Sequence, residues 1–428
     1  MKENNVRVRI APSPTGFAHI GTAYTALFNY AFAKKRGGKF IVRVEDTDVA
    51  RNVKGAEDAI FEGLTWLGIS HDESVKKPGS VGPYRQSEKL EKYATIAKDL
   101  VKAGLAYEDD GAIRYKNKGE DIFWIDLIKG KITFPGDQIT DFVIQKSDGY
   151  PTYNFAVVVD DLDMKITHVI RGEDHVSNTP RQLAIYKALK KEPPKFAHHP
   201  TIRNKEHKKL SKRHDNVDIM FYKKQGYLPE ALVNFLSLLG WSHPKEKEIF
   251  DLSEFVELFS LKRVRSAGPV FDTEKLDWMN KQYLGKMSDE EFVEYIGAFS
   301  KYAKNKDFKN LSLKTASLVR PRISKSVEYD KMAGYLYEDP KVDKKLFGGN
   351  YKNHIKVALA SLKAVEKWTE ESITKALLES IDKKGFGTGK FFADLRVAIT
   401  GSRVSPPLNE TMAKMKKEII IKRLEKLS

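Results

Sequence analysis

The chain has 428 residues, and its 74 Lys and Arg against 58 Asp and Glu give a formal charge of +16. That length accommodates about two to four domains with their own cores. The charge favours a polyanionic partner, with a charged solubility surface as an equal alternative. The sequence has no Cys, which excludes disulfides and Cys-based zinc sites. Apolar runs fall short of the ~20 residues of a membrane span, and no signal-peptide core follows the start, so we expect a cytoplasmic protein.

The first fifty residues predict a strand–turn–helix–strand unit. Alternating apolar residues over 6–10 predict a strand, which leads into a turn rich in Pro and Gly. A helix is expected from His19, and Gly37 and Gly38 end it. A second strand is expected over residues 39–44. In such a unit, ligands bind beyond the carboxyl ends of the strands.

The start of the expected helix is a candidate phosphate site. Free backbone N–H groups and the positive end of the helix dipole attract anions there. Gly21 allows a ligand to approach the backbone closely, and His19 can donate an imidazole N–H to a phosphate oxygen. A lone His beside a Gly is more often structural, so the motif needs support from its neighbours.

An acidic run, EDTD at residues 45–48, lies where the second strand is expected to end. Its carboxylates suit a cationic ligand group, and they can also cap a helix expected from Gly55. Another helix is predicted over residues 87–105. Within residues 107–149, short strand-like pieces at 112–115, 122–124, 131–134 and 142–145 then indicate a domain inserted into the main fold, to which the chain returns at 147–163.

A second strand–turn–helix crossover is predicted around Arg171, with a strand over 165–170 and a helix over 178–189. This repeat indicates a parallel sheet. Arg171 can then reach the same crevice as Arg9 on the first strand. Two guanidiniums match one carboxylate well, which favours an acidic ligand side chain over an amide. The alternative for Arg171 is a surface ion pair with a neighbouring acidic residue.

The basic segment KLSKR, residues 209–213, follows an expected strand over 196–204. Lysines in such a segment can contact a phosphate-bearing ligand and stabilise its negative charge. A solvated surface or an RNA-contact patch is the alternative. A similar KMS at 286–288 lacks the second Lys, and we interpret Ser288 as a helix N-cap. From residue 225 onward the pattern predicts helices.

Three motifs occur in a fixed order: RIAPSPTGFAHIGT, FIVRVEDTD and KKLSKRH. With GPYRQSE, SDGYPTYNFA, VIRGEDH, GPVFDTEKLDWMN and ITGSR they resemble the signature set of class I aminoacyl-tRNA synthetases, most closely the bacterial glutamyl-tRNA synthetase family. The resemblance covers nearly the whole chain. It implies an α/β fold with a nucleotide-binding, doubly wound parallel sheet and an inserted α+β domain, followed by an all-α anticodon-binding half.

The resemblance also implies domain limits. Residues 1–84 and 154–215 would form the catalytic domain, and 85–153 an inserted domain, shorter than usual in the family, that binds the acceptor end of tRNA. Residues 216–287 would contact the tRNA stem, and 288–428 the anticodon. Glutaminyl enzymes carry β-barrels in that last half instead.

Roles of single residues follow from the resemblance alone. Catalytic or ATP contacts are expected from the first motif and the lysine segment, namely from His19, Gly21, Thr22, Lys209, Ser211 and Lys212. Thr22 stands where many class I enzymes carry a second His, and Leu210 replaces the usual Met.

The expected amino-acid site is formed by Arg9, Ser13, Glu45, Tyr153 and Arg171. Arg9 and Arg171 would bind the side-chain carboxylate of glutamate, and Glu45 its α-ammonium. The expected anticodon contacts are Arg322, Arg396 and Ser405, with Arg322 at the third anticodon letter.

The implied activity is ATP-dependent activation of L-glutamate to glutamyl adenylate and transfer to the 3′ end of tRNA(Glu). Mg²⁺ is expected with ATP, without a dedicated metal site or zinc, and a monomer without membrane contact is expected. The alternatives are a non-discriminating form that also charges tRNA(Gln), a glutaminyl enzyme, a shortened paralogue acting on a modified tRNA base, and an inert tRNA-binding protein.

Overall fold

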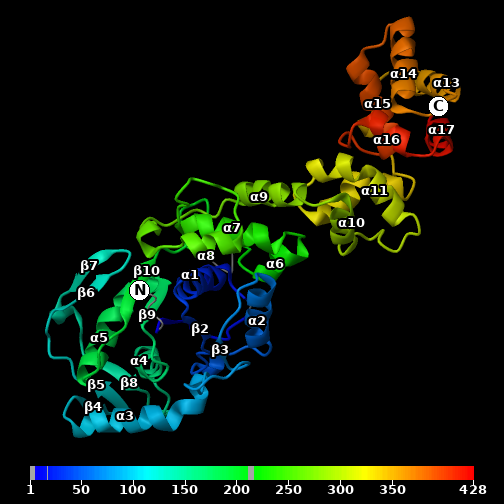
Figure 1. Ribbon diagram of the computed structural model, residues 1–428. Coiled ribbons are helices and arrows are strands. Elements are labelled where there is room, and N and C mark those ends of the chain that lie inside the picture. Colours follow the sequence, from blue (N-terminus) through cyan, green and yellow to red (C-terminus); the bar gives the residue numbers. More distant parts are fainter. Residues whose placement is uncertain (1–4, 17, 211–215) are drawn as a thin grey trace. The chain divides into compact units, whose positions relative to one another are not determined.

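The structure, a computed structural model, describes residues 5–16, 18–210 and 216–428. The chain forms two compact units (Figure 1). Unit 1 comprises Met1–Lys223 and Pro229–Leu276, and unit 2 comprises Lys224–Leu228 and Asp277–Ser428. Ser211 and Lys212, which were predicted to act in catalysis, lie outside the described residues.

Short parallel strands form the centre of unit 1. They are β1 (Arg7–Ile10), β2 (Lys39–Val42), β3 (Glu73–Ser74), β9 (His168–Gly172) and β10 (Lys195–His199). One sheet has the order β1–β2–β3, and β9 pairs with β10. The backbone N–H of Thr167 donates to the carbonyl of Arg7 at 2.9 Å, which sets β9 beside β1. The strand order 3-2-1-9-10 is doubly wound and reverses between β1 and β9, which confirms the predicted parallel fold.

Helices link and cover these strands. They are α1 (Ile20–Arg36), α2 (Ala56–Trp66), α4 (Tyr153–Asp163), α5 (Thr179–Ala188), α6 (Ile219–Lys224), α7 (Pro229–Gly240) and α8 (Leu252–Leu258). α1 packs against β1, β2 and β9 on one side and against α7 and α8 on another. It ends where expected, because Gly37 adopts the left-handed conformation (φ 68°) that favours glycine. The buried side chains of α1 are therefore at the centre of the unit's core.

The segment between β3 and α4 has its own antiparallel strands. It contains α3 (Leu90–Lys102), β4 (Ala106–Asp109), β5 (Ala112–Tyr115), β6 (Ile122–Asp126), β7 (Gly130–Phe134) and β8 (Phe142–Gln145). β4, β5 and β8 form a sheet, and β6 and β7 form a hairpin. Tyr93, Ile113 and Ile144 from this segment share a core with Phe155 of α4 and Ile185 of α5. The expected β-rich insertion is thus present and is packed onto the parallel fold.

Unit 2 is helical in its described part. After α9 (Thr273–Gly285), which begins in unit 1, come α10 (Asp289–Gly297), α11 (Phe308–Val319), α12 (Tyr329–Ala333), α13 (Tyr351–Lys363), α14 (Glu370–Lys384), α15 (Thr388–Thr400), α16 (Leu408–Lys414) and α17 (Lys417–Glu425). Ser288 caps α10: its hydroxyl accepts from the N–H of Glu291, whose carboxylate accepts from the N–H of Ser288. The predicted N-cap is confirmed. Within the described residues, no helix has the length and apolarity needed to cross a membrane.

Glu73 in β3 is a buried carboxylate, 2% exposed, with three donors around it. It accepts hydrogen bonds from Arg7 at 2.8 and 2.9 Å, from Lys39 at 2.9 Å and from the hydroxyl of Tyr84 at 2.6 Å. The hydrogen bonds from Arg7 lower the pKa of Glu73 from 4.5 to about 2, although burial opposes them. The ionised carboxylate therefore stabilises the folded state.

We expect Glu73→Gln to destabilise unit 1 by about 3 kcal/mol at neutral pH and by progressively less in acid. Because the folded-state pKa is lowered, the stabilisation is complete above the unfolded-state pKa of 4.5 and disappears as pH falls towards 2. Urea unfolding of both proteins at pH 7 and pH 3 measures the difference. A gap between variant and wild type that does not shrink at pH 3 contradicts the role assigned to the ionised carboxylate.

Candidate active site

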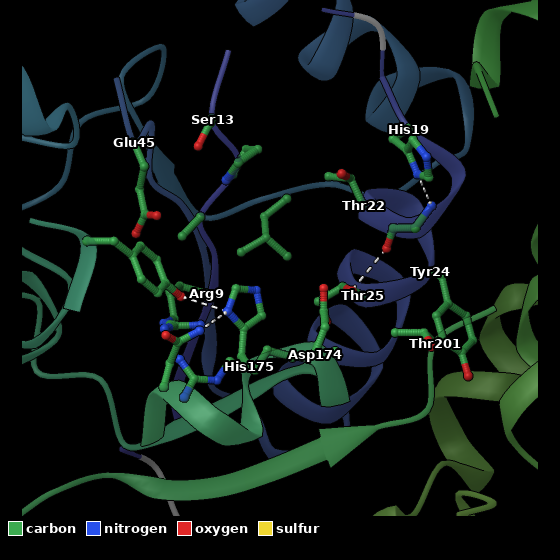
Figure 2. Close-up of a pocket in the computed structure, with 18 of the residues that line it drawn as sticks. Arg9, Ser13, His19, Thr22, Tyr24, Thr25, Glu45, Asp174, His175 and Thr201 are labelled. Atoms are coloured by element: carbon green, nitrogen blue, oxygen red, sulfur yellow. Dashed lines mark hydrogen bonds between the residues drawn. The ribbon is translucent and has the colours of Figure 1, made fainter. Parts of the chain in front are cut away.

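A cavity of about 640 Å³ lies at the carboxyl ends of β1 and β9, where the strand order reverses. Its lining includes every described residue predicted for ATP or amino-acid binding: Arg9, Ser13, His19, Gly21, Thr22, Glu45, Tyr153, Arg171 and Lys209. In Figure 2, Arg9, Ser13 and Glu45 lie on one side of the opening, and His19 and Thr22 lie on the other. The fold thus gives the cavity a charged side and a helix-start side.

The helix-start side is organised by His19, the N-cap of α1. Its Nδ1 accepts a hydrogen bond from the N–H of Gly21 at 2.9 Å. A neutral imidazole with an accepting Nδ1 carries its proton on Nε2, so this nitrogen is a donor. The backbone of Ile20 donates to Val217, and Ile219 donates to Ala18, at 2.7 and 2.9 Å. These bonds bring the chain that follows the lysine segment back to the start of α1.

Lys209 lies at the rim of the cavity, with its side chain 62% exposed. Its Nζ donates to Oδ2 of Asp174 at 2.7 Å. Burial raises the pKa of Asp174, but the hydrogen bond from Lys209 and the neighbouring His175 outweigh burial, and the pKa lies below its ordinary value. The described end of the lysine segment is therefore attached to the strand-end residues that follow β9.

The charged side depends on Arg43, which is fully buried. Its guanidinium contacts Asp161 at 2.7 Å, Glu45 at 3.0 Å and Asp160 at 3.6 Å. Asp161 also accepts two hydrogen bonds from Arg9, both 3.0 Å long. Burial raises the pKa of Glu45, opposed by Arg43, whereas Arg9 and Arg43 hold the pKa of Asp161 below its ordinary value despite burial. Arg43 thus connects two of the predicted ligand-binding side chains.

Sequence reasoning missed Arg43 and Asp161, although a signal was present. The helix VVVDDLD places two adjacent carboxylates in an apolar run, and charged residues are buried only when they are paired. The two carboxylates therefore predict basic partners in the core, and Arg9 and Arg43 are those partners.

Tyr153 and Arg171 complete the lining of this side. The hydroxyl of Tyr153 lies 3.1 Å from Nδ1 of His175. Burial, and then the positive charge of Arg171, lower the pKa of His175 to about 4, so its imidazole is neutral near pH 7. Burial raises the pKa of Tyr153 and lowers that of Arg171. Arg171 is 5% exposed and donates to buried groups, so its alternative interpretation as a surface ion pair is wrong.

The three predicted anticodon residues lie in unit 2. Nη1 of Arg396 donates to Oγ of Ser405 at 2.5 Å and to the carbonyls of Ser405 and Pro406 at 3.3 and 2.8 Å. Burial, and then the positive charge of Arg322, lower the pKa of Arg396, so these two guanidiniums lie within electrostatic reach. Nη1 of Arg322 donates to the carbonyl of Leu318 at 2.8 Å. The structure thus brings the three residues into one region.

Two family models match the chain. The model described as "tRNA synthetases class I (E and Q), catalytic domain" matches residues 5–112 and 109–278, and "Anticodon binding domain" matches 275–428. The chain therefore belongs to the class I tRNA synthetases for glutamate and glutamine.

Full-length relatives narrow this membership. The glutamate–tRNA ligase of Bacillus subtilis (strain 168) is 39% identical, over 99% of this chain and 100% of the relative. That of Thermus thermophilus is 40% identical, over 98% and 99%. A crystal structure of a glutamate tRNA ligase from Elizabethkingia meningosepticum in complex with its amino acid superposes with a TM-score of 0.85, at 32% identity and 99% coverage of both chains. Within its class, the chain belongs to the glutamate–tRNA ligases.

This membership settles several alternatives. The enzyme is a ligase that uses ATP and binds tRNA through its anticodon-binding domain. The match over 275–428 contradicts the shortened paralogue, which lacks that half. Among the described residues, no group of three or more His, Cys, Asp or Glu side chains is arranged to hold a metal ion.

We expect Arg43→Met to destabilise unit 1 by about 3–5 kcal/mol, because it leaves buried carboxylates without their shared cation. Urea unfolding of the full chain measures the change. Lys76→Met is the matched control, since it breaks an exposed ion pair with Asp58 and should change stability far less. Equal losses in the two variants would contradict the assignment of Arg43 as the shared cation.

Proposed function

We propose that the cavity binds ATP and L-glutamate side by side, and that the enzyme forms glutamyl adenylate there and transfers the glutamyl group to the 3′ end of tRNA(Glu). This proposal is supported by one observation: the predicted binding residues, which lie between positions 9 and 209 of the sequence, line a single cavity. A helix start with donor groups and a pair of guanidiniums are the complementary features that a nucleotide and an acidic amino acid need.

Glutamate binding is assigned to the charged side of the cavity. Arg9 and Arg171 bind the side-chain carboxylate, and Glu45 binds the α-ammonium. Tyr153, neutral because burial raises its pKa, donates its hydroxyl to the substrate, and Ser13 completes the site. In support, Nη1 of Arg171 is buried and has no hydrogen-bond partner among the described residues. An unpaired buried donor is costly, so a carboxylate ligand that pairs with it is favoured.

ATP binding is assigned to the start of α1 and to the lysine segment. Gly21, Thr22 and the Nε2–H of His19 bind the phosphates, and Lys209 binds them from the rim. Ser211 and Lys212 are assigned to the same phosphates on the family resemblance alone. Mg²⁺ travels with ATP and supplies further charge neutralisation on the phosphates.

The reaction then needs positioning and charge stabilisation rather than an enzyme nucleophile. The α-carboxylate of glutamate attacks the α-phosphorus of ATP in line, and the bond to pyrophosphate breaks. The lysines stabilise the negative charge that develops on the leaving pyrophosphate. A hydroxyl of the terminal ribose of tRNA then attacks the carbonyl of the adenylate, and AMP leaves.

The domain limits stated above are part of the proposal. Residues 1–84 and 154–215 carry the chemistry, 85–153 bind the acceptor end, 216–287 contact the stem and 288–428 bind the anticodon. The family resemblance also supports a monomer that acts in the cytoplasm without a zinc ion.

Anticodon reading is assigned to Arg322, Arg396 and Ser405. Unstacked loop bases are read on their edges by arginines and backbone groups. Arg396 is already bound to the carbonyls of residues 405 and 406, so it orders the backbone that the anticodon meets. Arg322 favours a discriminating enzyme that charges tRNA(Glu) alone.

We expect the enzyme to charge purified tRNA(Glu), and not tRNA(Gln), with labelled glutamate and ATP. Arg322→Ala should reduce the ratio of the charging rates of the two tRNAs. Arg320→Ala, which removes a neighbouring guanidinium bound to Met287 and Asp289, is the control and should keep the preference. Charging of both tRNAs by the wild type would retain the chemistry and overturn discrimination. Charging of neither, with no tRNA-dependent pyrophosphate exchange, would overturn the proposed reaction at this cavity.

We expect Lys212→Ala to slow glutamate activation by about a hundredfold to a thousandfold, because it removes a cation that stabilises the departing pyrophosphate. Pyrophosphate exchange in the presence of tRNA(Glu) measures this step. Lys286→Ala is the matched control, since it removes the Lys of the KMS sequence that precedes α10. Full pyrophosphate-exchange activity in Lys212→Ala would contradict the assignment of the lysine segment to ATP binding and catalysis.

A further inference from the structure

Arg171 is held by buried partners at two of its three guanidinium nitrogens. Its Nε donates to Nε2 of His198 at 3.1 Å. Its Nη2 donates to Oγ1 of Thr179 and to Oε1 of Gln182, both at 2.9 Å. The third nitrogen, Nη1, is buried and unpartnered among the described side chains, and Arg171 lines the cavity. The surroundings therefore select one orientation of the guanidinium.

The contact with His198 defines the tautomer of that imidazole. A guanidinium can only donate, so Nε2 of His198 must accept and the ring proton must reside on Nδ1. Nδ1 lies 2.5 Å from Oδ2 of Asp126 and donates to it. Burial lowers the pKa of His198, although Asp126 opposes it, so the ring is neutral. Both side chains are buried.

Asp126 is itself rigidly placed at the end of β6. Its Oδ1 accepts hydrogen bonds from the backbone N–H groups of Ile128 and Lys129, both at 3.0 Å, and of His198 at 3.1 Å. Burial raises the pKa of Asp126, but the hydrogen bond and charge of His198 and the backbone N–H groups together outweigh burial and lower this pKa, so the carboxylate is ionised near pH 7. One carboxylate thus fixes both the β6–β7 turn and the imidazole.

We infer that Asp126 and His198 are positioning residues for the amino-acid site. Asp126 holds His198 in the tautomer that accepts from Arg171, and His198 holds Arg171 with Nη1 available to the side-chain carboxylate of glutamate. The inference rests on the proposed function. It also means that a residue of the inserted segment determines the geometry of the glutamate pocket.

The variant Asp126→Asn tests the tautomer directly. The amide oxygen can keep the backbone hydrogen bonds, whereas the amide N–H₂ faces Nδ1 of His198 and forces the ring proton onto Nε2. Nε2 of His198 and Nε of Arg171 then both carry a proton, so neither can accept a hydrogen bond from the other. An Asn in place of a catalytic Asp imposes the wrong tautomer on its His partner in the same way. Losing this charge-assisted hydrogen bond should weaken the affinity for glutamate by about tenfold to a hundredfold.

We expect Asp126→Asn to raise KM for glutamate by about tenfold to a hundredfold and leave KM for ATP unchanged. The preference for glutamate over glutamine in kcat/KM should fall by a similar factor. His198→Leu should do the same, because it removes the acceptor. His198→Gln retains a donor for Asp126 and an acceptor for Arg171, so it should recover most of the affinity for glutamate. Charging of tRNA(Glu) by the full-length enzyme measures all three.

Glu73→Gln is the matched control, because it also replaces a buried carboxylate of unit 1 with an amide, at a position that does not line the cavity. It should lower stability and leave KM for glutamate unchanged. If Asp126→Asn and His198→Leu behave like this control, or raise KM for ATP equally, the positioning role is overturned while wild-type charging upholds the proposed function. If the wild type charges no glutamate, the proposed function fails and the inference with it.

A second measurement does not require activity. Nitrogen NMR of the histidine-labelled full-length protein reports which ring nitrogen of His198 is protonated, with assignment by the His198→Gln variant. We expect the proton on Nδ1 in the wild type and on Nε2 in Asp126→Asn. A wild-type ring protonated on Nε2 overturns the inference.

Discussion

The ion-pair network around Arg43 is the constraint on which the site depends. A fully buried guanidinium is tolerated only because three carboxylates surround it, and two of these belong to one turn of α4. Through Asp161 the network orients Arg9, and through a direct hydrogen bond it holds Glu45 on the same side of the cavity. The side chains assigned to glutamate binding are therefore held in place without a ligand, so that less ordering is needed when one binds.

Topology puts these groups within reach of each other. Because the strand order reverses between β1 and β9, the connections that follow these strands diverge and leave a crevice at their carboxyl ends. Arg9 belongs to β1 and Arg171 to β9, so the two guanidiniums flank that crevice. The start of α1 opens onto the same place, which sets donor N–H groups next to the charged side (Figure 2).

The sequence predicted those parts of the fold and the site that depend on local pattern. Alternation in VRVRI, the Pro/Gly turn and Gly37 suffice to define the first strand, the helix and its end. The strand β4 was missed, because its residues Glu108 and Asp109 are polar and exposed, and only its pairing with β5 makes it a strand. Arg43, Asp126 and His198 were missed for a related reason: their importance lies in contacts between residues far apart in sequence, such as the 72 positions between Asp126 and His198.

The ion pair between Lys209 and Asp174 has a consequence for the ATP contact proposed at Lys209. The rim lysine is not an uncompensated charge, because its ammonium already lies 2.7 Å from a carboxylate. Engaging a phosphate there is an exchange of one anion for another, and the net attraction is the difference between the two pairs. Ionic strength screens both pairs, so it weakens this contact less than the formal charge of the lysine suggests. The contact proposed between Lys209 and ATP therefore depends on this local exchange of partners more than on the overall positive charge of the protein.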